Sequence, residues 1–318
     1  MAAKRVVGID TGGTKLLGGV VDERLDVHHR VHRLFRGANR EEALGIMVEA
    51  VEEARAAAPD VVAVGFGIPS LVDQQRGTSV TSVHLPIEDV PFREIMHERI
   101  GLPVHIDNDA NLAVLAEQRY GAARGANHVV LLTLGTGIGG GLVLDGRLYR
   151  GSMGAGAELG HMVVDLDGPR CQGNCPNRGC LEAVCSGTAI GREGLEAARL
   201  APGSALWLAM TDGQEITGAL VSELAKAGDP TAGRVIERAG RRLGVGIANL
   251  VNIFNPEVVV VGGGAVGAGE LLLTPARKVL GERALRPSRD VVRVVPAHFG
   301  PEAGMLGAAV LALADGEV

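Results

Sequence analysis

All four cysteines of this 318-residue chain lie between residues 171 and 185. Cys171, Cys175, Cys180 and Cys185 stand in a short segment, a pattern that favours a bound metal over disulfides in a reducing compartment. Zinc is the metal that thiolate and imidazole groups hold in tetrahedral sites. The segment lacks the C-x-x-C pair of common zinc folds, so spacing alone makes the four cysteines the default ligands.

Three glycine-rich turns follow apolar runs: DTGGTK at residues 10–15, LGTGIGGG at 134–141 and GGGAVGAG at 262–269. Each offers backbone amides that no side chain shields, which is what phosphate oxygens require. A single turn of this kind also fits a plain hairpin. Three together, two with threonine and one with Asp10 and Lys15, favour a nucleotide held between two domains.

Two of these turns also match the dinucleotide-binding pattern G-x-G-x-x-G, at residues 135–140 and 262–267. The first match precedes a returning strand, whereas the dinucleotide fingerprint requires a helix there. The second precedes an expected helix and has Glu282 about 20 residues further on. A dinucleotide-dependent oxidoreductase is therefore an alternative, which thermal protection by NAD instead of ATP would distinguish.

The segment IDNDANLA contains two carboxylates, Asp107 and Asp109. Phosphoryl transfer depends on positioning, charge neutralisation and a carboxylate that accepts the proton of the attacking hydroxyl. The two side chains lie on opposite sides of an expected extended turn, so only one is expected to reach a ligand. Asp109 also suits the N-cap of the helix that follows.

The first third of the chain reads as an α/β unit. Residues 6–21 predict two antiparallel strands joined at a glycine turn, and residues 41–58 carry apolar side chains at helical spacing. Residues 61–73 predict a strand leading into a loop, and residues 102–121 a short strand, a polar turn and a helix.

The pattern of apolar run, glycine turn and apolar run recurs at residues 128–151, which indicates an internal duplication. Residues 234–254 predict a long helix that Asn255 and Pro256 end, followed by a buried strand, and residues 303–314 predict a final helix. No linker separates the halves. The expected division is a small α/β domain of residues 1–112 plus 303–318, and a large α/β domain of residues 113–302 with the zinc-binding loop.

Composition excludes several classes of protein. Apolar residues make up 46% of the chain, charged residues 21%, and the net charge is −6 with scattered Lys and Arg, so no nucleic-acid partner is expected. No secretory leader and no run long enough to cross a bilayer stand in the sequence, which predicts a cytoplasmic protein with no membrane partner. Glycine, at 47 residues, has roughly twice its usual share of about 7%.

The motifs DTGGTK, LGTGIGGG followed by GAGAELGH, and the cysteine segment ending in GCLE together resemble the ROK family of sugar kinases and repressors, along nearly the whole chain. This resemblance implies an α/β, actin-like ATPase fold of ribonuclease H type, with two domains around a central cleft. It implies ATP-dependent phosphorylation of a hexose, foremost glucose to glucose 6-phosphate. Homodimers and homotetramers are common in the family.

The resemblance also assigns roles to residues. Asp109 is the implied general base and Asn108 a sugar ligand beside it, with Glu158, His161 and Glu182 on the ring hydroxyls. Asp10 would hold Mg²⁺ through water. The remaining implied nucleotide contacts are Gly12, Gly13, Thr14 and Lys15 in the first turn, Gly135, Thr136 and Gly137 at the β- and γ-phosphates of ATP, and Gly262, Gly263 and Gly264 at the adenosine.

For zinc the family pattern implies His161, Cys171, Cys175 and Cys180 as ligands, with Cys185 as a buried apolar residue. This chain departs from the common family pattern C-G-C-G-x-x-G-C, because three residues instead of one separate its first two cysteines. Either Cys171 or Cys185 then completes the metal shell. A filled shell makes the zinc structural, and it would hold His161 and Glu182 beside the sugar.

Three functional alternatives stay open within the family. A sugar-responsive repressor would carry a helix-turn-helix before the first phosphate motif, which here begins at Asp10. His84 stands where the family's glucose kinases have a sugar-contacting asparagine, so N-acetylmannosamine, fructose or another hexose is an alternative substrate. Inorganic polyphosphate is an alternative donor.

Overall fold

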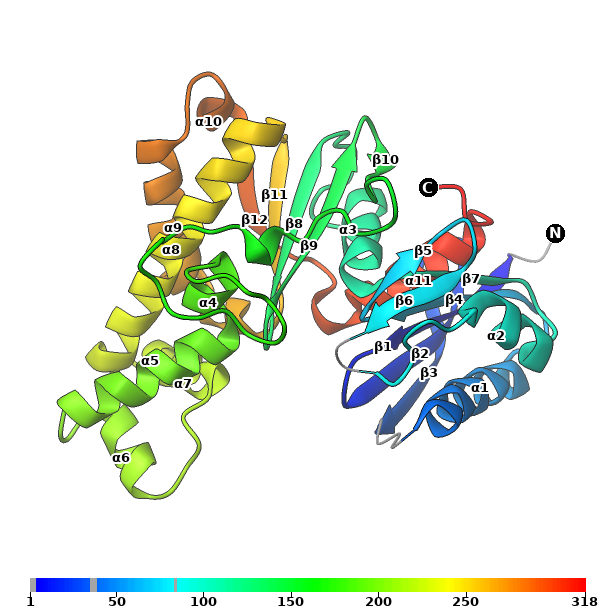
Figure 1. Ribbon diagram of the computed structural model, residues 1–318, viewed down its shortest axis with the longest axis horizontal. Helices are drawn as coiled ribbons and strands as arrows, with labels where there is room; N and C mark the ends of the chain where they lie inside the picture. Colours follow the sequence, from blue (N-terminus) through cyan, green and yellow to red (C-terminus); the bar gives the residue numbers. More distant parts are fainter. Residues whose placement is uncertain (1–3, 35–38, 83–84) are drawn as a thin grey trace. The chain divides into compact units, whose positions relative to one another are not determined.

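The computed structural model describes residues 4–34, 39–82 and 85–318 and separates into two compact units (Figure 1). Unit 1 comprises Met1–Arg124, Gly141–Ala157 and His298–Val318, and unit 2 comprises Gly125–Gly140 and Glu158–Ala297. His84, the residue that bears on the choice of sugar, lies outside the described residues.

The sheet of unit 1 has the strand order β3-β2-β1-β4-β7. Strands β1, β2 and β3 are antiparallel neighbours, whereas β4 and β7 run parallel to β1. The carboxyl ends of β1, β4 and β7 therefore share one edge, and the register aligns Asp10, Gly67 and Asp107 in one row across it. The strands are Arg5–Thr11 (β1), Lys15–Asp22 (β2), Val27–Leu34 (β3), Val61–Ile68 (β4) and Val104–Asn108 (β7).

Helices cover both faces of this sheet because successive side chains of a buried strand point to opposite faces. Val7 packs in a core with α1 (Arg40–Ala57) and α2 (Phe92–Ile100), while its neighbour Val6 packs with α11 (Ala303–Leu313). Helix α11 lies close to the sheet: a Cβ added at Gly8 or Gly65 would stand 2.2 or 1.9 Å from a carbonyl oxygen of that helix. The helices predicted at residues 41–58 and 303–314 are confirmed to within a residue at each end.

Two predictions for the middle of unit 1 need correction. The expected loop after β4 is a β-hairpin of β5 (Ser70–Asp73) and β6 (Thr78–Ser82). No polar turn separates β7 from α3 (Asp109–Arg119), because the strand runs directly into the helix. Asn108, and not Asp109, is the N-cap: its side chain accepts hydrogen bonds from the amides of Ala110 and Asn111.

The second sheet has the order β10-β9-β8-β11-β12. In both sheets three consecutive strands stand in reverse chain order and two later strands follow them, which confirms the predicted duplication. Strand β11 is parallel to both β8 and β12. The chain passes between the units within β9. The bounds are Val129–Leu134 (β8), Ile138–Leu144 (β9), Arg147–Leu148 (β10), Val258–Gly262 (β11) and Arg293–Pro296 (β12).

Unit 2 is mainly helical outside its strands. Its long helix α8 (Pro230–Phe254) begins four residues before the predicted range, because the side chain of Asp229 caps it and Pro230 suits its first turn. It ends as predicted at Asn255, which adopts the left-handed conformation with φ 46°. The other helices are α4 (Leu181–Cys185), α5 (Gly187–Leu200), α6 (Ala205–Thr211), α7 (Gly218–Lys226), α9 (Glu270–Arg283) and α10 (Ser288–Val291).

The borders of the two units differ from the expected division of the chain. An expected border after residue 112 would cut α3, which lies wholly in unit 1, and residues 141–157 also belong to that unit. Unit 1 resumes at His298 because the amides of His298 and Phe299 both donate to Glu117 Oε1 on α3. Among the described helices, none is long and apolar enough to cross a membrane.

Candidate active site and metal centre

Asp10 stands at the carboxyl end of β1, enclosed by glycines. A Cβ added at Gly304 would lie 2.7 Å from either carboxylate oxygen of Asp10, and one added at Gly67 would lie 3.3 Å from Oδ1. Burial raises the pKa of Asp10 to about 7, and the negative charge of Asp109 adds to this rise. A divalent cation bound through water would compensate the charge of this buried carboxylate, so Asp10 fits the role expected for it at a hydrated Mg²⁺.

Asp107 and Asp109 have different environments. Asp107 is 1% exposed and accepts hydrogen bonds from Arg150 Nε at 2.7 Å, Asn111 Nδ2 at 2.9 Å and its neighbour's amide at 2.8 Å. These three hydrogen bonds engage the carboxylate of Asp107 with other groups of the protein. Asp109 is half-buried at the first position of α3, where the helix dipole favours a negative charge. Its Oδ1 accepts from the amide of Ala110 at 2.9 Å. Because Arg150 neutralises Asp107, Asp109 is the candidate base of the two carboxylates.

The first glycine turn lies between β1 and β2, as predicted. The amide of Gly12 donates to the carbonyl of Lys15 at 2.8 Å, which closes the turn. Gly13, Thr14 and Lys15 are exposed. Their exposure leaves the side chains of Thr14 and Lys15 open to an anion, in keeping with a phosphate-binding turn.

The second glycine turn, in unit 2, is fixed by contacts with the segment around α5. The carbonyl of Gly135 accepts from the amide of Gly187 at 2.8 Å, and the carbonyl of Thr136 accepts from Thr188 Oγ1 at 2.8 Å. These bonds engage the carbonyl oxygens of Gly135 and Thr136. Within the turn the amide of Gly135 donates to the carbonyl of Gly137 at 2.9 Å. The amides left for a phosphate in this turn are therefore those of Thr136 and Gly137.

A cavity of 600 Å³ in unit 2 adjoins this turn. Gly135 and Thr136 line it together with Gly264 of the third glycine turn, as expected for one nucleotide site. Gly262 and Gly263 do not line it. Gly263 has φ 86°, and a Cβ there would stand 2.4 Å from the carbonyl oxygen of Leu134. This glycine therefore allows the chain after β11 to approach the end of β8. Further lining, which the sequence did not indicate, comes from residues 187–192 of α5 and from residues 215–219 at the start of α7.

The dinucleotide reading of the third turn does not fit the structure. Gly264 and Gly267 lie in a 3₁₀ helix, Gly264–Ala268, and the α-helix that follows, α9, begins only at Glu270. Glu282 lies within α9, whereas the acidic residue of a dinucleotide site follows the next strand of a βαβ unit.

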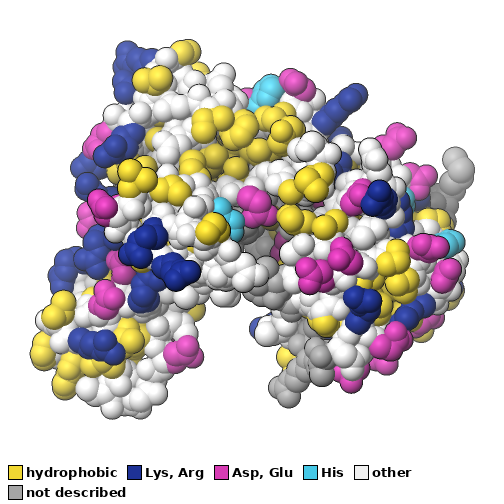
Figure 2. Space-filling model, in the orientation of Figure 1, with side chains coloured by type: hydrophobic (Ala, Val, Ile, Leu, Met, Phe, Trp, Pro, Cys, Tyr) yellow, Lys and Arg dark blue, Asp and Glu magenta, His cyan; other side chains and the backbone are white. Residues whose placement is uncertain are grey.

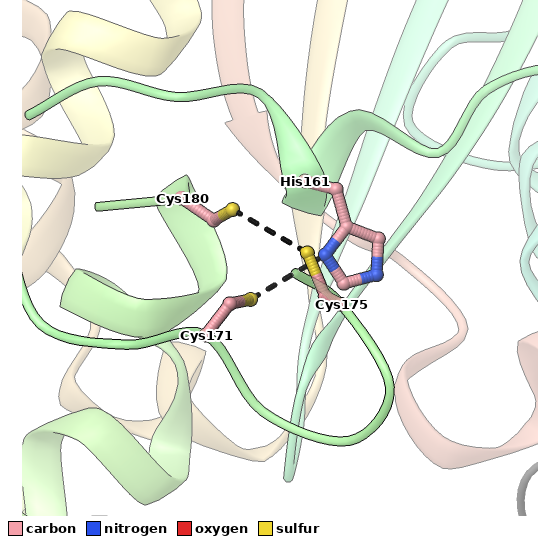
Figure 3. A group of neighbouring side chains, drawn as sticks. All are labelled: His161, Cys171, Cys175 and Cys180. Carbon is pink, nitrogen blue, oxygen red and sulfur yellow. Dashed lines mark hydrogen bonds between the residues drawn. The ribbon is translucent and has the colours of Figure 1, made fainter. Parts of the chain in front are cut away.

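The cysteine segment brings four ligand atoms together (Figure 3). Ligand atoms of His161, Cys171, Cys175 and Cys180 all lie within 4.8 Å of one another. Cys171 Sγ is 3.5 Å from His161 Nδ1, and Cys175 Sγ is 3.9 Å from Cys180 Sγ. Tetrahedral zinc separates neighbouring ligand atoms by roughly 3.3–3.8 Å. Two of the separations here, 3.5 and 3.9 Å, are near this range, and three sulfurs with one imidazole nitrogen match the donor set of a structural zinc.

The wider cysteine spacing is accommodated by a tight loop. The amide of Cys175 donates to the carbonyl of Gln172 at 3.3 Å, and Gly173 between them is left-handed with φ 57°. This turn brings Cys175 back beside Cys171. Cys185 is fully buried on α4 outside the group, so the structure gathers Cys171 and not Cys185 with the other three residues.

Burial raises the pKa of the thiols of Cys171 and Cys180 above the ordinary value. Zinc binds thiolates, so binding a cation here would have to release protons from these groups. His161 presents Nδ1 to the sulfurs, while its Nε2 lies 3.9 Å from Glu158 Oε2. One ring nitrogen can thus serve a metal while the other faces a carboxylate.

Glu182 connects the metal centre to the second glycine turn. Its Oε2 accepts from the amide of Ile138 at 2.8 Å, and its Oε1 lies 3.6 Å from Cys171 Sγ. A Cβ added at Gly137 would stand 2.3 Å from Oε2. The residue expected to bind a sugar hydroxyl therefore also holds the turn beside it, a role that no pattern in the sequence indicated.

Within unit 1 the structure brings Asp10 and Asp109 within electrostatic reach, together with Asn108. Within unit 2 it brings Glu158, His161 and Glu182 beside the cysteines. Sequence reasoning missed Arg150, the partner of Asp107, because the two are 43 residues apart and no motif links them.

The repeated sheet order and the phosphate-type turns define a protein of the actin-like ATPase fold. The chain matches the profile of the ROK family over residues 6–315, and it belongs to that family. It is 36% identical to a glucokinase of Streptomyces coelicolor over 310 residues, which is 96% of each chain.

Two solved structures are similar along the whole chain. A ROK family glucokinase from Streptomyces griseus, in complex with glucose and AMPPNP, has a TM-score of 0.87 at 36% identity, covering 98% of this chain and 99% of that one. A ROK family transcriptional regulator, a homologue of the E. coli MLC protein, has a TM-score of 0.89 at 28% identity, and 80% of its chain is covered.

Proposed function

We propose that this protein transfers the γ-phosphoryl group of ATP to the 6-hydroxyl of glucose. The observation that carries the proposal is the pair of carboxylates at one edge of the first sheet, Asp10 at the end of β1 and Asp109 at the start of α3. A kinase of this kind needs one carboxylate for the hydrated metal and one for the sugar hydroxyl. The likeness to glucokinases over 96% of the chain supports the same reading.

Asp109 acts as general base for the sugar hydroxyl, and Asn108 binds the sugar beside it. Asp10 holds Mg²⁺, which neutralises phosphate charge when ATP is bound. On unit 2, Glu158, His161 and Glu182 bind sugar hydroxyls. The nucleotide is held by the first glycine turn at Gly12, Gly13, Thr14 and Lys15, by the second at Gly135, Thr136 and Gly137, and by the third at Gly262, Gly263 and Gly264.

Zinc, held by His161, Cys171, Cys175 and Cys180, has a structural role in this proposal. Because all four positions are filled by protein groups, it has no open site for substrate. It fixes His161, and Glu182 through its contact with Cys171. Four cysteines without disulfides suit the reducing cytoplasm, where we place the protein.

The test is a coupled assay of ADP release with Mg·ATP and a panel of hexoses: glucose, mannose, fructose and N-acetylmannosamine. We expect turnover with glucose, and a loss of roughly 10²- to 10⁴-fold in Asp109→Asn. Asp89→Asn is the matched control, since Asp89 is an exposed turn residue of unit 1 whose left-handed backbone an asparagine adopts readily.

Turnover with another hexose but not glucose would reassign the substrate. No turnover with any sugar, together with measurable glucose binding, would favour a sugar-sensing role like that of the similar regulator. Retention of most activity in Asp109→Asn would overturn the assignment of the base.

A further inference from the structure

A second cavity in unit 2, of 540 Å³, lies between α5 and α8 and is rich in arginine. Arg234, Arg238 and Arg242 recur every four residues along one face of α8, and Arg192 faces them from α5. Figure 2 shows Lys and Arg side chains gathered over this helical part of unit 2. The proposed kinase reaction gives no role to the three arginines of α8.

The charges in this cavity are not balanced. Four arginines line it against two glutamates, Glu193 and Glu196. Glu193 pairs with both Arg238 and Arg242. Arg234 donates to the neutral hydroxyl of Thr231 at 3.1 Å and has no carboxylate partner among the described residues. The cavity therefore has a formal surplus of two positive charges.

We propose that this cavity is a binding site for the phosphoryl group of a small metabolite. Guanidinium groups bind phosphate through paired, charge-assisted hydrogen bonds, and several of them on two helices can surround one phosphoryl group. Ala197 and Leu200 provide an apolar wall beside the arginines, which suits a small organic body attached to the phosphate. A phosphomonoester matches both features.

Two of the arginines connect this cavity to the candidate active site. Arg192 Nη2 donates to the carbonyl of Ala183 at 2.8 Å, and Arg242 Nη1 donates to the carbonyl of Val184 at 3.2 Å. Both carbonyls belong to α4, the short helix that carries Glu182. Arg192 also lines the cavity beside the second glycine turn. A phosphoryl group that draws these guanidinium groups away from α4 would loosen Glu182.

The consequence for catalysis rests on the proposed function. Occupation of the arginine cavity lowers the affinity for glucose, so a phosphorylated sugar such as the reaction's own product can act as an inhibitor at a site other than the active site. The existence of the phosphate site itself does not depend on kinase activity.

Calorimetric titration tests the site, with inorganic phosphate and glucose 6-phosphate as separate probes and with Mg·AMPPNP filling the nucleotide site. Wild type is compared with Arg234→Gln and Arg238→Gln. Arg241→Gln is the matched control, because Arg241 is exposed on the same helix and does not line the cavity. Arg192 and Arg242 are left intact, since they hold α4.

We expect both probes to bind wild type and Arg241→Gln, and glucose 6-phosphate to bind more tightly than inorganic phosphate. In Arg234→Gln and Arg238→Gln the affinity for both probes should fall by about tenfold or more, because a charge-assisted hydrogen bond is lost. Equal binding by all four proteins, or no binding to wild type, overturns the proposal. Arg238 is 52% exposed and Arg234 is exposed, so neither change should prevent folding.

Coupling is measured separately as the effect of inorganic phosphate on glucose affinity. A severalfold loss of affinity in wild type that disappears in Arg238→Gln supports the connection through α4. An equal effect in both proteins contradicts it. If no hexose is phosphorylated, the titration with phosphate still decides the site, so failure of the kinase proposal and failure of this one are distinguishable.

Discussion

Arg150 donates from Nε to Oδ2 of Asp107 across 2.7 Å, and their side chains are only 19% and 2% exposed. The same carboxylate accepts from Asn111 and from the amide of Asn108. This ion pair therefore fixes the junction between β7 and α3, where Asn108 and Asp109 stand. Arg150 thereby positions the segment that carries the candidate base.

Replacing Arg150 by glutamine should destabilise the protein by about 3 kcal/mol, because the buried carboxylate of Asp107 loses its counter-charge. Urea denaturation measures this loss. The double variant Arg150→Gln/Asp107→Asn should recover part of it, since no buried charge is then left unpaired. Arg147→Gln, an exposed position on the neighbouring strand β10, should change stability little, and equal stability of Arg147→Gln and Arg150→Gln would refute the role of the pair.

The free energy of unfolding of the metal-free protein should fall as pH rises, because the folded protein holds the proton of Asp10 more tightly than the unfolded chain does. The folded pKa of Asp10, about 7, is above the ordinary value of 3.8 because of burial and the charge of Asp109, so the unfolded state loses its proton first. The contribution of Asp10 to stability is full below pH 3.8 and is lost as pH rises through about 7.

Urea denaturation in EDTA between pH 4 and pH 8 tests this linkage. The free energy of unfolding of Asp10→Asn minus that of wild type should grow by a few kcal/mol from roughly pH 4 to pH 7 and then level off. A difference that stays constant over this range would show that Asp10 has an ordinary pKa. Asp60→Asn, an exposed position of the same unit, is the control.

Gly137→Ala should disturb the second glycine turn. The new methyl group would stand 2.3 Å from Glu182 Oε2, so Glu182 must move away from the amide of Ile138. We expect a destabilisation of about 1–3 kcal/mol and weaker ATP binding, measured by denaturation and calorimetry. Gly267→Ala is the matched control, because no atom lies within 4 Å of its added Cβ. Similar effects of the two changes would argue against the contact with Glu182.

Cys175→Ser should abolish zinc binding, because it removes one of the four gathered ligands. Elemental analysis of protein purified without chelator or added metal should find about one zinc per chain in wild type and in Cys185→Ala, since Cys185 lies outside the group. A zinc-free wild type would exclude the site, and zinc retained in Cys175→Ser would exclude that ligand.

Removing zinc with a chelator should abolish glucose affinity before it unfolds the part of unit 2 that holds the nucleotide cavity. The physical reason is that a bound metal would fix His161 and the loop in contact with Glu182. The second glycine turn keeps further hydrogen bonds that do not involve Glu182, such as that from the amide of Gly187 to the carbonyl of Gly135. Glucose titration and circular dichroism on the same chelated sample measure both effects. Unchanged glucose affinity in zinc-free protein would contradict a role for the metal in sugar binding.

Local patterns in the sequence determined much of this protein. Apolar spacing predicted α1 and α11 nearly to the residue, and Asn255 with Pro256 predicted the end of α8, because periodicity and caps depend on neighbours in the chain. The repeated strand and glycine-turn pattern predicted the duplicated sheet. The motifs also led to the ROK family, which the comparisons confirm.

Only the tertiary structure decided which residues meet. It paired Asp107 with Arg150, which distinguishes Asp107 from Asp109, and it placed Cys171 instead of Cys185 beside His161. It also joined Glu182 to the amide of Ile138. Contacts between residues 10 to 44 positions apart depend on how loops and helices pack, and the spacing of residue types along a chain does not encode that geometry.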